Sequence, residues 1–295
     1  MKRVVFICFL IFTSVWLRAQ DASLPRIAVG DFYIYSGSHT GSFDMDITDF
    51  SKLAPESEVL GMDLSYYKKN YLLQRGDGNY LSVKLGLNFV NKEGNEYRLN
   101  PQLQIGFTYM TNNTAQYGIH LKETQRVDTL ASVSTSNVVY VDSIYSSNIQ
   151  TDYWSDNLLL DIALMYRTDV ESRWSFFGGF GIAGGVSLKS RTDIFHTETE
   201  ALNFIIPGNE NEFSMQNSAE PVHTIESFSN SLNVLAFVQL PLGVNFKVAK
   251  STKFWKDLNM FYEITPLLKY WNIPEAGSYI TVGIKHGIGF KLNIG

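Results

Sequence analysis

Residues 80–109 decide the fold, reading Y-L-S-V-K-L-G-L-N-F-V, then N-K-E-G-N-E-Y-R, then L-N-P-Q-L-Q-I-G-F-T-Y. In the first and third runs, apolar and polar residues alternate along the chain. Alternation with a period of two is typical of a β-strand that has one apolar and one polar face. The middle run is polar and contains a glycine, so we expect a turn that joins the two strands as a hairpin.

The same alternation recurs along the rest of the chain. It covers residues 27–36, 42–50, 59–73, 157–168, 173–189, 232–248, 258–271 and 278–295. With the opening hairpin, these runs make ten strands, or eight if 27–50 forms a cap or plug. Leu158-Leu159-Leu160 blurs the pattern of 157–168, so a short helix is an alternative there.

Two long polar insertions, 112–156 and 190–231, separate strands on one side, whereas the other connections are shorter. Long loops on one face and short turns on the other are typical of transmembrane β-barrels. The sequence therefore predicts an all-β fold, an antiparallel transmembrane β-barrel of 8–10 strands with two long extracellular loops. We expect the first insertion to project beyond the membrane as a hairpin.

Residues 1–19 predict a cleaved secretory signal peptide, which leaves 20–295 as the barrel domain. Lys2 and Arg3 precede an apolar run, and Ala19 marks the most plausible cut. The alternative is an uncleaved anchor helix, but the apolar run is shorter than the span of about 20 residues that a membrane requires. The single cysteine, Cys8, lies in this segment, so the mature chain lacks a thiol for a disulfide or a zinc site.

The charge balance argues against nucleic acid as a partner. The whole chain carries 24 − 29 = −5, and removing 1–19 takes away three cations, which gives 21 − 29 = −8. No later stretch holds enough consecutive apolar residues for a transmembrane helix. An exported chain that is rich in aromatic residues and in alternating strands predicts the bacterial outer membrane, with lipid as its surroundings.

The strand pattern resembles small bacterial outer-membrane barrels, and the resemblance covers nearly the whole mature chain. It rests on the pattern, not on a diagnostic motif. The aromatic, Gly-rich style and Gln20 after the cut look similar to barrels of the Bacteroidetes. Such barrels often end on an aromatic residue, whereas this chain ends at Phe290-Lys291-Leu292-Asn293-Ile294-Gly295.

A secreted soluble barrel is the structural alternative, in which the apolar face would line a core or a ligand site. Alternation alone does not separate the two, but two aromatic girdles favour the membrane. The predicted girdles are Phe89, Tyr97, Tyr166, Trp174 and Tyr262 at the periplasmic rim, and Tyr80, Tyr109, Trp154, Tyr270, Trp271 and Tyr279 at the outer rim.

The polar phase of the strands predicts a lumen that is blocked by paired polar groups, because a barrel of this size is too narrow for an open channel. The predicted lumen network is Lys84, Gln102, Gln104, Asp161, Arg167, Lys189, Glu263, Lys269 and Lys285.

Other motifs have ordinary explanations. The G-x-G-x-x-G of 179–184 lies inside an alternating strand, where small residues leave space for neighbours, and not in a dinucleotide site. The Arg-Gly-Asp of 75–77 is expected to form part of a tight turn, because Gly and Asp are common turn residues. The histidines and acids of 190–231 could hold a cation, but we expect this segment to be a solvated acidic loop. His286 interrupts an apolar phase, for which a local register change is expected.

We therefore expect a non-enzymatic barrel, without cofactor or metal, whose surface loops act in adhesion, partner binding or envelope integrity. One alternative is a small transport barrel for apolar or small solutes. A lipid-modifying barrel enzyme is a further alternative, but His286 has no visible serine and acid partners in the sequence.

Overall fold

The computed structural model describes most of the chain beyond the predicted signal peptide. The described residues are 27–41, 45–70, 77–90, 97–131, 138–168, 172–206, 209–217, 220–249, 255 and 257–294. The signal peptide of 1–19 and most of the Arg75-Gly76-Asp77 tripeptide thus lie outside the described residues. No helix in the described ranges is long and apolar enough to cross a membrane.

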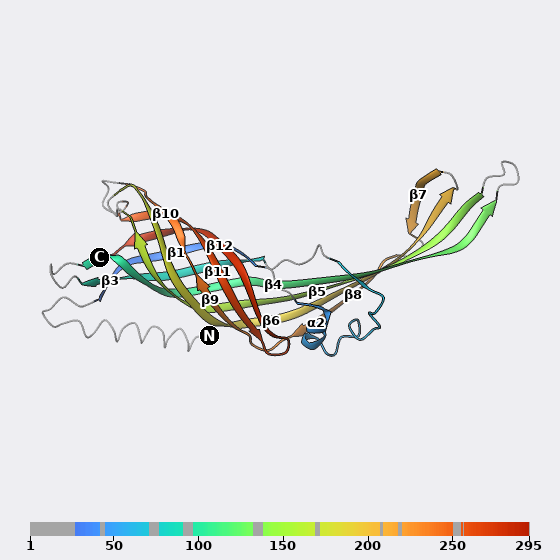
Figure 1. Ribbon diagram of the computed structural model, residues 1–295, viewed down its shortest axis with the longest axis horizontal. Helices are drawn as coiled ribbons and strands as arrows, with labels where there is room; N and C mark the ends of the chain where they lie inside the picture. The colour runs from blue at the N-terminus through green and yellow to red at the C-terminus, as the bar shows by residue number, and fades with distance from the viewer. Residues whose placement is uncertain are drawn as a thin grey trace.

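Antiparallel strands pair in a circuit that closes on itself (Figure 1). The strands of the circuit are, in chain order, β1 (Ile27–Gly41), β3 (Asp77–Val90), β4 (Tyr97–Ala131), β5 (Val138–Arg167), β6 (Trp174–Ile206), β9 (Val234–Gln239), β10 (Leu242–Lys247), β11 (Leu258–Ile273) and β12 (Gly277–Asn293). β6 pairs with both β9 and β10, both of these pair with β11, and β12 pairs with β1.

β9 and β10 occupy one strand position, because both pair with β6 on one side and β11 on the other. Pro241 lies at the break between them and cannot donate a ladder hydrogen bond. The circuit of described strands therefore has 9 − 1 = 8 positions. This confirms the predicted all-β barrel and its lower strand count. The opening hairpin of the sequence is β3 with the first part of β4, and residues 157–168 are strand rather than helix.

The predicted division of residues 27–50 is wrong in detail. Residues 27–41 form a barrel strand and not part of a cap, whereas α2 (Ile47–Leu53) stands where a second strand was expected. Asp46 caps the helix by accepting hydrogen bonds from the Thr48 and Asp49 amides, and Asp49 completes a capping box. The helix buries Phe50 and Leu53.

Of the predicted strand 59–73, the described residues 59–70 do not form a barrel strand either. Described residues 59–67 run through turns, and β2 (Lys68–Lys69) makes a short pairing with β4. Val59 and Leu60 are buried, together with Phe50 and Leu53 of α2. We call residues 45–67 the cap, because their apolar side chains cover one end of the barrel.

The barrel is apolar on the outside and polar on the inside. Along β12, Val282 is 72% exposed, whereas Lys285 is 1% exposed. Along β11, Leu268 is 48% exposed, whereas Lys269 is 4% exposed. A soluble barrel would bury its apolar phase, so this arrangement decides against that alternative and for a membrane-spanning barrel.

A sheet extends from one end of the barrel, and we call it the arm. It contains the parts of three barrel strands that lie outside the barrel: residues 113–131 of β4, 138–155 of β5 and 190–206 of β6. β7 (Asn209–Asn217) and β8 (Val222–Ser229) pair with β6 and complete the arm. Figure 1 shows the arm pointing away from the C-terminus, with α2 at its foot. The pairing of β4 with β5 confirms that the first insertion extends as a hairpin, and the second insertion also continues a barrel strand, β6, with β7 and β8 paired to it.

Candidate functional site

A first charge cluster lies in the lumen near the end that carries the C-terminus. Its centre is Asp31, whose carboxylate lies 3.0 Å from Arg167 and 3.7 Å from Lys291. Gln102 donates to Asp31 at 2.6 Å, and Tyr33 donates to Gln102 at 2.7 Å. The carboxylate is therefore surrounded by donors, as a buried charge requires.

A second cluster lies nearer the arm, around Asp161. The Asp161 carboxylate lies 3.0 Å from the Lys84 ammonium and 4.0 Å from that of Lys285. Gln239 donates to Asp161 at 2.8 Å and accepts from Lys285 at 2.7 Å. Thr108 adds a longer hydrogen bond of 3.4 Å.

Aromatic rings supplement the acids inside the lumen. The formal charges of these buried side chains in the lumen sum to 5 − 3 = +2. The cations are Lys84, Arg167, Lys269, Lys285 and Lys291, and the acids are Asp31, Asp161 and Glu263. Lys84 lies 5.3 Å from the centre of the Tyr35 ring, and Lys269 lies 4.7 Å from that of Trp271. Because ring faces attract cations, they help to hold the excess positive charge.

Most of the predicted lumen residues face the interior. The structure brings Lys84, Asp161 and Lys285 together in one cluster and Gln102 with Arg167 in the other. Gln104, Glu263 and Lys269 are also buried inside, and Glu263 accepts from Thr265 at 2.9 Å.

The prediction for Lys189 is wrong, because its side chain is exposed on the outer surface. Asp156 pairs with Lys189 and Asn157 pairs with Ser187, so Leu188 is an extra residue in β6. Such a bulge reverses the phase of the strand, and both Leu188 and Lys189 consequently face outward.

Sequence reasoning missed Asp31, Lys291 and Gln239. A second bulge, between Val29 and Asp31, turns Asp31 inward and conceals the phase of β1. Lys291 shares the phase of Lys285, and this signal could have identified it.

The described side chains leave little free space in the lumen. A cavity lined by Tyr33, Arg167, Glu263 and Lys291, among others, has a volume of about 10 Å³. Such a space is at the lower limit for a single water molecule. Around this first charge cluster, the described interior is packed like a core.

The cap seals the arm end of the lumen with apolar packing. Phe50, Tyr153 and Trp271 are 0% exposed and belong to one buried cluster. Asn233 of the barrel rim donates to the Tyr153 hydroxyl at 2.6 Å. The cap thus adds an apolar layer above the two charge clusters.

One carboxylate of the arm holds the cap. Glu226 of β8 accepts from the Ser57 hydroxyl and from the amides of Glu58 and Val59, the latter two at 3.1 and 3.3 Å. Asn230 donates to the Leu53 carbonyl at 2.7 Å. The cap and the foot of the arm therefore form one hydrogen-bonded unit.

Among the described acids of the second insertion, four accept hydrogen bonds on strands of the arm and do not lie in the solvated loop that was expected: Asp193, Glu198, Glu200 and Glu226. Tyr145 donates to Glu198 at 2.6 Å, and Ser143 donates to Glu200 at 3.2 Å. Burial, with the hydrogen bond to Glu198, raises the pKa of Tyr145 to about 12. No cluster of three or more metal-binding side chains exists in the described ranges.

Two acids face each other across neighbouring strands of the arm. Asp152 of β5 pairs with Asp193 of β6. Burial raises the pKa of Asp152, and the Asp193 carboxylate adds to this rise, while a hydrogen bond from Gln150 opposes it. The charge of the Asp193 carboxylate is balanced by the Arg191 guanidinium, which lies 2.7 Å from it.

His286 faces outward, in the same phase as Ile284 and Ile288, and the predicted register change is wrong. Its Nε2 lies 3.0 Å from the Ser38 hydroxyl of the neighbouring strand, so the two polar groups satisfy each other. Within the described residues, no carboxylate hydrogen-bonds to this imidazole, and a serine-hydrolase triad is therefore incomplete here.

The aromatic girdles are partly as predicted. Tyr166 and Trp174 are exposed near one rim, and Tyr109 and Tyr270 are exposed near the other. Tyr80 and Trp271 instead point inward and are buried. Their phase explains this result, because Tyr80 aligns with Ser82 and Lys84, and Trp271 aligns with Lys269.

No family model matches the sequence, and no curated protein matches it. One similar solved structure is Neisserial surface protein A (NspA), with 11% identity, a TM-score of 0.27 and coverage of 90% of this chain and 99% of that chain. Another is Ail, the attachment invasion locus protein of Yersinia pestis, in complex with the heparin analogue sucrose octasulfate. It has 12% identity, a TM-score of 0.23 and coverage of 90% and 100%. Because the identities and TM-scores are low, the assignment of the fold is based on the strand pairing described above.

Proposed function

We propose that this chain is a non-enzymatic bacterial outer-membrane barrel that binds a partner at the cell surface through its arm, in the manner of an adhesin. The observation that carries the proposal is the contrast between a filled, capped lumen and a long hydrogen-bonded sheet that continues barrel strands outward. The outward apolar side chains support the membrane setting. The predicted signal peptide supports export.

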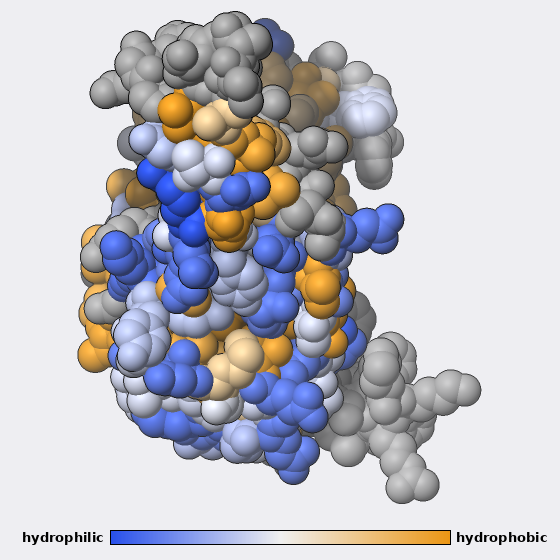
Figure 2. Space-filling model, turned by 90° about the vertical axis from the view of Figure 1, so that its right-hand side faces the viewer, coloured by the Kyte–Doolittle hydropathy of each residue, from blue (hydrophilic) through white to orange (hydrophobic). Residues whose placement is uncertain are grey.

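The arm has the features of a binding surface rather than of a solvated loop. Barrel strands β4, β5 and β6 continue into the arm beyond bulges at the junction, so a contact on the arm is supported by strands that are part of the barrel. Val127, Leu130, Val222 and Ile225 are exposed apolar side chains on it, from 49% to 66%. Seen from the arm end, hydrophilic and hydrophobic patches alternate on the surface (Figure 2). Mixed surfaces of this kind are usual at protein interfaces.

Shortening the arm tests the proposal. A variant that lacks residues 123–145 and 200–221, with a tight turn in place of each, removes the distal arm. It retains Ser147, Glu226 and Asn230, which contact the cap. Cells that display this variant should lose attachment to surfaces and to one another, whereas cells that display the full chain should attach.

Two controls make the result interpretable. Both proteins should show a heat-dependent shift in gel mobility, since a closed membrane barrel resists unfolding in detergent. Protease added to intact cells should cut the full arm. Equal attachment by the two proteins, or full protection of the arm from protease, would count against a surface-binding function.

The absence of enzymatic activity is part of the same proposal. Ser38 and His286 form a polar pair on the outward face, with neighbouring outward positions occupied by Ile284 and Ile288. His286→Ala should therefore leave lipid turnover in cells unchanged. A loss of lipid hydrolysis in this variant would favour the lipid-enzyme alternative.

A further inference from the structure

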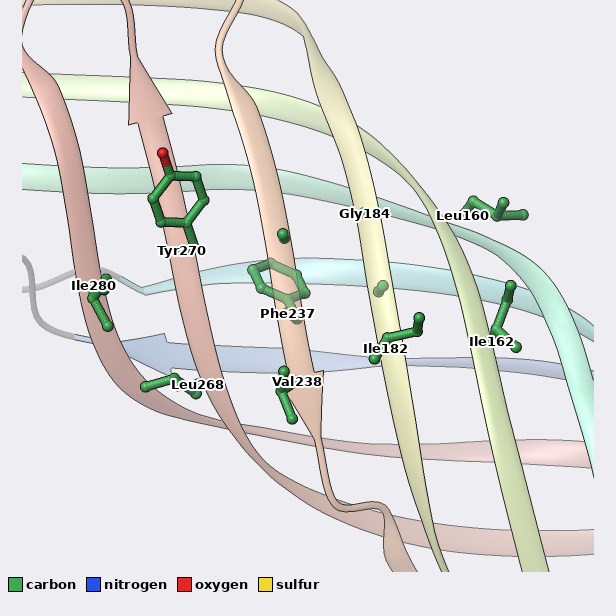
Figure 3. Close-up of a pocket in the computed structure, with 11 residues that line it drawn as sticks. Leu160, Ile162, Ile182, Gly184, Phe237, Val238, Leu268, Tyr270 and Ile280 are labelled. Carbon is green, nitrogen blue, oxygen red and sulfur yellow. The ribbon is translucent and has the colours of Figure 1, made fainter.

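A groove interrupts the outward apolar surface of the barrel. It has a volume of about 470 Å³, and its floor includes Gly184 of β6 and Ala236 of β9, which pair directly. Leu160, which pairs with Gly184, stands on one side, and Tyr270, which pairs with Ala236, stands on the other. Figure 3 shows Leu160, Ile182 and Tyr270 around the position of Gly184.

The groove results from residue size and not from missing backbone. A Cβ atom added at Gly184 would meet nothing closer than the Leu235 carbonyl oxygen, at 3.7 Å. The backbone therefore does not require glycine at this position. At the neighbouring Gly185, by contrast, a Cβ would lie 2.0 Å from the Leu158 carbonyl oxygen.

A cation lies above the groove on the same strand. The bulge at Leu188 turns Lys189 outward, and its ammonium lies 5.0 Å from the centre of the Trp154 ring. Arg191 lies 4.5 Å from the same ring. Indole rings and basic side chains at the edge of an apolar band typically mark the level of lipid headgroups.

The distance from groove to cation corresponds to one leaflet. Gly184 and Lys189 pair with Leu160 and Asp156, which are four residues apart on β5, because Leu188 is a bulge residue; this is about 13 Å along the strand. With a strand tilt of about 40°, the backbone of Lys189 lies about 10 Å from the level of Gly184, and a long lysine side chain covers the remaining distance to the edge of a leaflet of about 12 Å, half of an apolar band of about 25 Å. A single lipid can therefore place its headgroup at Lys189 and its chain in the groove.

We propose that the Gly184/Ala236 groove and Lys189 together bind an outer-leaflet lipid that carries an acyl chain and a phosphate headgroup of net negative charge. Lys189 supplies the charge that complements the phosphate, and the apolar groove holds the chain. This inference rests on the proposed membrane-spanning barrel. A second protein copy is the other conceivable occupant, but the cation at headgroup level one leaflet above the groove favours lipid.

The neighbouring acids are already engaged. Asp193 is bound by Arg191 and accepts from the Trp154 indole at 3.0 Å and from Ser227 at 2.6 Å. Asp156, opposite Lys189, hydrogen-bonds with Tyr109. Within the described residues, no carboxylate lies within 4.0 Å of the Lys189 ammonium, which leaves it available to a phosphate.

Native mass spectrometry of the full chain in detergent tests the inference. The folded protein is incubated with equal amounts of dimyristoyl phosphatidylglycerol and dimyristoyl phosphatidylcholine, which have identical chains. We expect a roughly fivefold preference for the phosphatidylglycerol, as one exposed cation near the headgroup supplies. Lys189→Gln should abolish the preference, and Gly184→Leu should reduce retention of both lipids.

Matched controls separate the site from general effects. Lys122→Gln removes an exposed cation of the arm, and Val83→Leu enlarges an outward side chain away from the groove. Both should behave as wild type. Equal retention of the two lipids by the wild type, or unchanged retention by Gly184→Leu, would overturn the lipid site. If the protein still shows a heat-dependent mobility shift in that case, the barrel itself stands. A wild-type protein without that shift would instead refute the barrel and, with it, this inference.

Discussion

Asp161→Asn is the most informative perturbation of the barrel interior, because it removes one charge with almost no change of shape. Asp161 is 0% exposed and lies between two lysines. Its carboxylate is 3.0 Å from the Lys84 ammonium and 4.0 Å from the Lys285 ammonium. The amide would leave both cations buried without their acid.

The magnitude follows from these distances. At an effective dielectric constant of about 20, attraction across 3.0 and 4.0 Å amounts to about 5.5 and about 4 kcal/mol. Burial of the carboxylate itself costs several kcal/mol, which the substitution recovers. We therefore expect Asp161→Asn to lower the free energy of unfolding by about 3–5 kcal/mol, the usual result of breaking a buried pair.

Urea unfolding in detergent micelles, followed by the heat-resistant gel form, measures this change. Adding Lys84→Met to Asp161→Asn should restore part of the lost stability, because one unpaired cation is then removed. Arg126→Gln, which removes an exposed partner of Asp142 on the arm, should leave the midpoint unchanged. An Asp161→Asn protein as stable as wild type would refute the pairing argument.

Three further outcomes are expected. Glu226→Ala should free the cap and accelerate protease cleavage within residues 54–67 roughly tenfold, because hydrogen bonds to a charged group are lost, whereas Glu220→Ala should not. Gly185→Ala should abolish the folded gel form while Gly184→Ala retains it, and equal folding of both would contradict the backbone contact at Gly185. Since the folded pKa of Asp152 is raised, protonation of its carboxylate stabilises the arm, so amide protection factors near it should rise as pH falls through that pKa toward the ordinary value of 3.8, once exchange rates are corrected for the intrinsic rate at each pH. In Asp152→Asn this rise should disappear, and its persistence would assign it to another group.

The amino-acid sequence by itself determined most of the barrel strands and the two faces of each. Alternation is a local property, since successive side chains of a strand point to opposite sides. It was therefore sufficient to place Lys84, Asp161 and Lys285 on the polar phase, and the structure places all three inside. It also showed where the barrel would be extended, because 112–156 and 190–231 lie between well-marked strands.

Only the tertiary structure decided which way the faces point and which residues meet. Alternation is equally compatible with an apolar interior and an apolar exterior, and closure of the circuit settled this choice. The bulge at Leu188 reversed the phase of Lys189, and no local pattern marks one extra residue. The sequence offered a cap only as an alternative for 27–50 and did not indicate its helix, since Ile47, Phe50 and Leu53 become a helix face through the N-cap residue Asp46 and through burial against distant strands. Such long-range contacts depend on packing between segments far apart in the chain, which local sequence does not encode.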